Sequence, residues 1–222
     1  NYAANQFIAV VVGNANFNKI CKFLENNFKS KCIPSSPQPI IWRHAHTTEE
    51  RSGLDQAHFV FGMHAPFVGH KDYYALEVLD AYLANGMSSR LFQRIREELG
   101  LAYIINSSIN AEQNYSYYCI YVGTQKESVD KVKRIILDEF AAVGSMTERD
   151  LEQAKERLIG LRNISSEESD KVMNDLLFAE LLGDVREYHR YESKVKLVTL
   201  GQVKKLSKEM VKEYSTAVVQ PK

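Results

Sequence analysis

The sequence has few cysteines, no excess of either charge and no long apolar run. Its three cysteines, Cys21, Cys32 and Cys119, are widely spaced and include no C-x-x-C pair, so neither a disulfide framework nor a thiolate zinc site is expected. We interpret them as reduced thiols in a cytoplasmic protein. The formal net charge of zero gives no overall attraction to nucleic acid or to an anionic membrane surface.

Several functional motifs are absent as well. No apolar run approaches the roughly 20 residues needed to cross a bilayer, and the chain does not open with a secretory pattern. There is no G-x-S-x-G, no phosphate-binding loop and no dinucleotide fingerprint. A partner among nucleic acids or membranes is therefore not expected. At 222 residues the chain is long enough to bury a substantial core.

The most informative segment spans residues 86–103 and reads GMSSRLFQRIREELGLAY. An amphipathic helix lies between two glycine turns, at Gly86 and Gly100, and a strand begins at Tyr103. Arg96 and Tyr103 stand seven positions apart and converge only if Gly100 reverses the chain between them. Such a site offers fixed hydrogen-bond donors and no nucleophile, which suits gripping a peptide backbone or a developing oxyanion.

The remaining pattern predicts an α+β fold, a two-layer α/β sandwich with a largely antiparallel sheet. Apolar or alternating runs predict strands at residues 7–13, 57–64, 103–110, 115–123 and 215–219. Helical spacing predicts helices that start after Asn16 and Asp72, and others over residues 126–143, 147–164, 166–182 and 199–213. Thr147 and Asp150 have the spacing of a capping box.

A proline-containing connector divides the chain. Three prolines fall within residues 34–39, which favours an extended segment. We therefore predict that residues 1–32 are the tail of another domain, that residues 33–50 are a connector and that residues 51–222 form the main domain. A tyrosine precedes an apolar run both at the start and at residues 214–219, a short echo that indicates a duplicated domain.

On these residues the chain resembles the C-terminal half of the M16 family of zinc peptidases, which includes the processing peptidases, pitrilysin and insulysin. The resemblance is carried by Asp72, by residues 86–96 and 100–103, and by the opening block from Tyr2 to Phe28. It implies a metallohydrolase fold of the LuxS and processing-peptidase type. It also implies a divided active site, in which the N-terminal half holds zinc through H-x-x-E-H and a distant Glu.

The resemblance assigns the substrate contacts to this half. The family's C-terminal domain contributes an Arg and a Tyr that match Arg96 and Tyr103, as substrate clamp and as donor to the carbonyl or oxyanion. We expect the pair to face a cavity shared with a metal carried elsewhere. The family match favours these roles, whereas without it Tyr103 is an ordinary strand tyrosine and Arg96 a solvated helix residue. Arg90 is interpreted as fixing the start of the helix.

No metal is expected in this chain itself. The sequence has no H-x-x-E-H, and the segment that would match the zinc helix, about Leu76–Asp80, has leucines in place of ligands. The full-length protein is expected to carry Zn²⁺ in its N-terminal half and to hydrolyse peptide bonds, while this chain alone is inactive. The expected partners are a peptide substrate and a zinc-bearing domain or subunit. Apolar helix faces left without that domain also predict self-association of the fragment.

An alternative function comes from a different class. M16-like chains also occur as non-catalytic subunits that pair with an active partner or form the core of a larger complex, and such a chain keeps Arg96 and Tyr103 without cleaving anything. A peptide-binding module that never cleaves is a third hypothesis. The presence of H-x-x-E-H upstream of this chain separates the enzyme from the scaffold.

The histidines do not change these expectations. His44 and His46 lie beside the connector with no helix to fix them, so a true metal site there is rejected. His58 and His64 have even spacing, share one face of a strand and are interpreted as core or interface groups.

Overall fold

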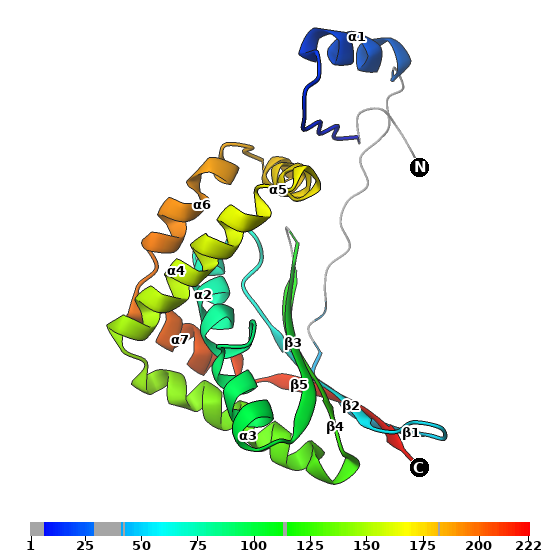
Figure 1. The fold of residues 1–222 in the computed structure, drawn as a ribbon, viewed down its shortest axis with the longest axis vertical. Helices are drawn as coiled ribbons and strands as arrows, with labels where there is room; N and C mark the ends of the chain where they lie inside the picture. The colour runs from blue at the N-terminus through cyan, green and yellow to red at the C-terminus, as the bar shows by residue number, and fades with distance from the viewer. Residues whose placement is uncertain (1–6, 29–40, 42, 113–114, 182) are drawn as a thin grey trace. The chain divides into compact units, whose positions relative to one another are not determined.

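The computed structural model describes residues 7–28, 41, 43–112, 115–181 and 183–222. The chain divides into two compact units, one of residues 1–41 with 161–191 and a larger one of residues 42–160 with 192–222. The larger unit contains the sheet and most of the helices (Figure 1). Within the described residues no helix is long and apolar enough to cross a membrane.

Five strands form one sheet in the order β1-β5-β2-β4-β3. β1 pairs with β5 in parallel and every other neighbouring pair is antiparallel, so the sheet is mostly antiparallel, as predicted. β3 lies at one edge and β1 at the other. The strands are β1 (His46–Arg51), β2 (Ala57–His64), β3 (Ala102–Ala111), β4 (Ser116–Thr124) and β5 (Tyr214–Pro221).

Helices of the larger unit cover one face of this sheet (Figure 1). Two helices, α4 and α6, span the boundaries between the two units along the chain. The helices are α1 (Phe17–Asn27), α2 (Tyr73–Leu83), the π-helix η2 (Phe92–Glu98), the short 3₁₀ turn η3 (Lys126–Ser128), α3 (Val129–Ala142), the 3₁₀ turn η4 (Val143–Ser145), α4 (Glu148–Ser165), α5 (Ser169–Leu181), α6 (Glu187–Lys196) and α7 (Leu200–Met210).

The core lies between the helices and the covered face of the sheet. Alternate residues of β2 are buried, and the register places Phe61 opposite Ile120 of β4 and Thr216 of β5 on that same face. α2 contributes Leu76 and Leu79, both fully buried. Each such side chain contributes roughly 2 kcal/mol by leaving water. The two-layer α+β sandwich predicted from the sequence is the observed fold.

Three predicted helix starts are found, with different capping. The Asn16 side chain accepts a hydrogen bond from the Lys19 backbone N–H at 3.0 Å. Asp150 Oδ2 accepts from the Thr147 backbone N–H at 2.9 Å, so the predicted capping box is confirmed. Asp72 precedes α2, but its side chain makes no capping hydrogen bond, which corrects that part of the prediction.

Other parts of the prediction differ from the structure. The strand predicted at residues 7–13 is wrong, because residues 7–12 have no regular structure and are largely exposed. An apolar run becomes a strand only when a neighbouring strand takes up its backbone hydrogen bonds, and no described strand does so here. Half of the connector predicted at 33–50, residues 33–40 and 42, lies outside the described residues, and residues 46–50 belong to β1. α6 was not predicted, since Val195 is its one buried residue and it carries no apolar stripe.

Candidate functional site

Arg96 and Tyr103 meet where a helix ends beside the edge strand β3. The guanidinium carbon of Arg96 lies 4.6 Å from the centre of the Tyr103 ring and 4.8 Å from the centre of the Phe92 ring. The Arg96 guanidinium therefore contacts an aromatic ring from its own helix and one from the strand that follows. Glu97 Oε1 lies 3.5 Å from Arg96 Nε. The predicted convergence of Arg96 and Tyr103 is confirmed, while their roles stay predictions.

The backbone between them turns as the spacing requires. Gly100 has φ +57°, in the left-handed region that glycine enters without a side-chain clash. The Leu101 N–H donates to the Ile95 carbonyl at 2.8 Å and the Gly100 N–H to the Arg96 carbonyl at 3.2 Å. These bonds close the end of the helix over residues 90–98, which we call the clamp helix.

The clamp helix is wound mostly as a π-helix, over Phe92–Glu98. π-helical turns are rare and occur frequently at functional sites, because the wider winding re-aims side chains. Leu91 and Ile95 hold the helix against the core, and both are fully buried. The amphipathic pattern predicted a helix here but carried no indication of its winding.

Tyr103 occupies a β-bulge. The register pairs Ala102 with Thr124 and Ile104 with Gly123, so Tyr103 is an extra residue on β3. A bulge interrupts the alternation of a strand and redirects a side chain. The Thr124 hydroxyl donates to the Leu101 carbonyl at 2.6 Å and fixes the start of the strand.

The pair is open to solvent. Tyr103 is 74% exposed, and the Arg96 side chain is 34% exposed. The shared cavity expected around them is therefore not closed by the described residues alone.

The segment Leu76–Asp80, which would correspond to the zinc helix of a duplicated first domain, does not fit a metal. Leu76 and Leu79 are fully buried in the core, and Asp80 accepts a hydrogen bond from the Tyr118 hydroxyl at 2.7 Å. Burial raises the pKa of the Asp80 carboxyl, although its hydrogen bonds and the charge of Arg157 act in the opposite direction. Throughout the described part of the chain, no group of three or more His, Cys, Asp or Glu is arranged to hold a metal ion.

The histidines take part in structural contacts. His44 Nε2 lies 3.0 Å from Glu213 Oε2, and the His44 and His64 rings meet edge to face at 5.3 Å. His58 Nδ1 lies 2.7 Å from the Tyr121 hydroxyl. His58 and His64 are half-buried on one face of β2, as their even spacing predicts.

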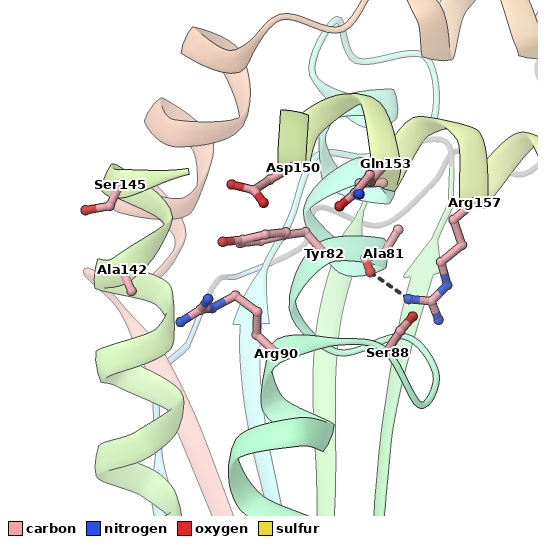
Figure 2. A pocket seen from close by; sticks show the side chains of 10 residues that line it. Ala81, Tyr82, Ser88, Arg90, Ala142, Ser145, Asp150, Gln153 and Arg157 are labelled. Carbon is pink, nitrogen blue, oxygen red and sulfur yellow. Dashed lines mark hydrogen bonds between the residues drawn. The ribbon is translucent and has the colours of Figure 1, made fainter. Parts of the chain in front are cut away.

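A cavity of about 560 Å³ lies near the start of the clamp helix (Figure 2). Arg90 from the helix and Arg157 from α4 both line it, together with Tyr82. Arg157 donates to the carbonyls of Ala81 and Asn85. Sequence reasoning missed Arg157, because no spacing pattern connects it with residues more than seventy positions earlier.

Comparisons with known proteins identify the family of this chain. Residues 1–158 match the family model described as the peptidase M16 inactive domain. The uncharacterized zinc protease YmxG of Bacillus subtilis is 30% identical over 186 residues, which cover 80% of this chain and 44% of that protein. An uncharacterized zinc protease of Streptomyces coelicolor is 26% identical over 235 residues, covering 100% of this chain and 51% of its own length. The chain thus spans about half the length of these relatives.

Solved structures share the fold at lower identity. A protease from Helicobacter pylori superposes with a TM-score of 0.83 and 18% identity, covering 95% of this chain and 54% of that one. A chain of complex III2 from Candida albicans superposes with a TM-score of 0.80 and 17% identity, covering 94% of this chain and 53% of that one. The same fold therefore occurs both in a protease and in a chain of complex III2.

Proposed function

The chain belongs to the peptidase M16 family, as its inactive domain, and from this premise we propose that it is the substrate-clamping half of a zinc-dependent endopeptidase. Its relatives are named zinc proteases and are about twice its length. In this proposal the zinc and its ligands lie outside this chain, in an N-terminal domain or a partner subunit. The observation that carries the proposal is the Arg96–Tyr103 pair, held together beside the sheet edge.

The chemistry of the pair suits a peptide substrate. The Arg96 guanidinium has five N–H donors and no acceptor. Its Nε lies near Glu97 and it contacts two rings, so in this proposal its terminal N–H groups reach a carbonyl or a C-terminal carboxylate of the substrate. The exposed Tyr103 hydroxyl would donate to the scissile carbonyl oxygen as negative charge grows on it. Neither group is a nucleophile, so this half holds and polarises the substrate and does not attack it.

Tyr103→Phe in the full-length protein tests this role. The substitution removes one hydroxyl and keeps the ring that contacts Arg96. We expect kcat for peptide hydrolysis to fall roughly 10²- to 10³-fold, about 3 kcal/mol of transition-state stabilisation, with an unchanged fold. Tyr117→Phe is the matched control, because Tyr117 is an exposed tyrosine on the neighbouring strand β4. An unchanged kcat in Tyr103→Phe removes Tyr103 from the mechanism.

A second function has its own supporting observation. The likeness to a chain of complex III2 supports a non-catalytic partner or scaffold subunit of M16 type. The exposure of Tyr103 fits that function too, since an exposed side chain is also available to a protein partner. The two functions differ in whether the other half of the protein, or its partner subunit, binds zinc. Zinc content and peptide hydrolysis, measured on the full-length protein or on its complex, distinguish an active enzyme from a scaffold.

A further inference from the structure

We propose that Arg157 on α4 and Glu139 on α3 are positioning residues that fix the start of the clamp helix and, through it, the place of Arg96 against Tyr103. The inference rests on the proposed function of that pair. It extends the site to two charged residues that are far from the clamp helix in sequence.

Arg157 holds the turn that leads into the clamp helix. Its Nη1 donates to the Ala81 carbonyl at 3.1 Å, and its Nη2 donates to the Asn85 carbonyl. The last carbonyls of a helix have no partner within the helix, and Ala81 belongs to the last turn of α2. One planar guanidinium therefore joins the end of α2 to the turn after it, which a lysine ammonium does not reproduce.

Gly86 fits this arrangement for two reasons. Its φ of +81° is a conformation that other residues rarely adopt. A Cβ at this position would also overlap the Arg157 guanidinium. The turn is continued by Ser89, whose backbone N–H and hydroxyl both donate to the Gly86 carbonyl, at 3.1 and 2.7 Å. The clamp helix begins at the next residue.

Glu139 on α3 contacts Arg90, the first residue of the clamp helix. Arg90 Nε lies 2.5 Å from Glu139 Oε2, and the Glu139 carboxylate is buried. The Arg90 guanidinium also lies 5.7 Å from the centre of the Tyr82 ring. Figure 2 shows Arg90 and Arg157 lining the same cavity, with the Tyr82 ring next to Arg90. Loss of the Arg90 contact would leave the buried Glu139 carboxylate uncompensated, although the Arg90 side chain itself is 43% exposed, so the pair resists opening from the Glu139 side.

The effect reaches Arg96 through the helix itself. Arg96 lies in the same π-helical segment as Phe92, whose ring it contacts, and two turns or less from Arg90. Rotation or rewinding of this segment would carry the guanidinium away from the Tyr103 ring, because Tyr103 is fixed separately by β3. Arg157 and Glu139, which fix the start of the clamp helix, therefore also determine the position of Arg96 relative to Tyr103 near its end.

The test uses Arg157→Gln in the full-length protein, with Arg149→Gln as the matched control. Arg149 is an exposed arginine on the same helix, so both variants lose one charge from α4. We expect amide hydrogen exchange at residues 87–101 to accelerate roughly tenfold in Arg157→Gln and to stay unchanged in Arg149→Gln. Arg157→Lys, which reaches one carbonyl, should restore part of the protection.

Kinetics supply the second measurement. If Arg96 holds the bound peptide, Arg157→Gln raises KM for a peptide substrate roughly tenfold while kcat changes less than in Tyr103→Phe. Glu139→Gln should give the same direction of change, with faster exchange confined to the start of the clamp helix. If exchange accelerates in the whole sheet as much as at residues 87–101, the variant has lost stability in general. That result in both Arg157→Gln and Glu139→Gln overturns the positioning role.

The outcomes separate this inference from the proposed function. In one outcome, Tyr103→Phe lowers kcat, but Arg157→Gln and Glu139→Gln change neither hydrogen exchange at residues 87–101 nor KM. The proposed function of Arg96 and Tyr103 then stands, and the positioning role of Arg157 and Glu139 fails. If Tyr103→Phe keeps full activity while Arg157→Gln still loosens residues 87–101, the proposed function fails and the anchoring of the helix stands.

Discussion

The buried hydrogen bond between Tyr118 and Asp80 permits a sharp prediction about stability. The Tyr118 hydroxyl donates to Asp80 Oδ1 at 2.7 Å, Tyr118 is fully buried and Asp80 is 6% exposed. Tyr118→Phe removes the hydroxyl and keeps the ring, whose centre lies 6.5 Å from that of Phe140. A hydrogen bond to a charged group contributes about 1.5–3 kcal/mol, so we expect the free energy of unfolding to fall by about 2 kcal/mol at neutral pH.

The pH dependence of this loss has a definite sign. Burial raises the pKa of Asp80 in the folded state above its ordinary value of 3.8. The stabilising contribution of Asp80 is therefore fully present below the unfolded pKa and is lost as the pH rises through the folded pKa. The Tyr118 hydrogen bond favours the carboxylate and limits that loss. Tyr118→Phe should consequently cost more stability at neutral pH than at a pH below 3.8.

Urea unfolding of this chain, followed by far-ultraviolet circular dichroism, measures the effect at both pH values. Tyr117→Phe is the control, since this exposed neighbour should change stability by less than about 0.5 kcal/mol. A loss in Tyr118→Phe that is the same at acid and neutral pH would refute the coupling to Asp80. A loss indistinguishable from that of the control would refute the hydrogen bond's contribution altogether.

Three further predictions concern the turn, a helix cap and metal binding. Gly100→Ala places a side chain at φ +57° with no neighbouring atom to clash, so urea unfolding should show a loss of about 1–2 kcal/mol from backbone strain alone. Thr199→Ala removes the hydroxyl of a complete capping box on α7 and should cost about 1 kcal/mol in the same assay. Added zinc or a chelator should leave the unfolding midpoint of this chain unchanged, because a stabilising ion must bind the folded state and no described cluster could hold one.

Local sequence was sufficient to predict the meeting of Arg96 and Tyr103. Both residues lie in one segment with a glycine between them, and the left-handed Gly100 determines the direction of the chain from one to the other. The same holds for the alternating strand β2 and for the Thr147–Asp150 capping box, which depend on neighbours a few positions away. Structure decided by short-range contacts can be predicted from short-range patterns.

The rest depends on contacts that no local pattern contains. Arg157 binds a carbonyl 72 positions away and Arg90 binds Glu139 49 positions away, so only the packed helices bring these groups together. The run at residues 7–13 failed as a strand for the same reason, since its structure depends on a partner strand. The π-winding of η2 also has no counterpart in the spacing of apolar residues, because a stripe of the same residues fits an α-helix equally well.

The clamp helix is anchored by buried residues but presents exposed side chains, which affects how the site would bind a peptide. Leu91 and Ile95 fix the clamp helix in the core, whereas Tyr103 points to solvent. Arg96 contacts both the Phe92 ring and the Tyr103 ring. A pair ordered before binding loses less side-chain entropy when a ligand arrives, where ordering costs about 0.5–1.5 kcal/mol for each long side chain. Phe92→Leu should therefore weaken peptide binding through Arg96 while leaving the Tyr103 hydroxyl in place, and an unchanged KM in that variant would show that the aromatic contact does not preorganise the clamp.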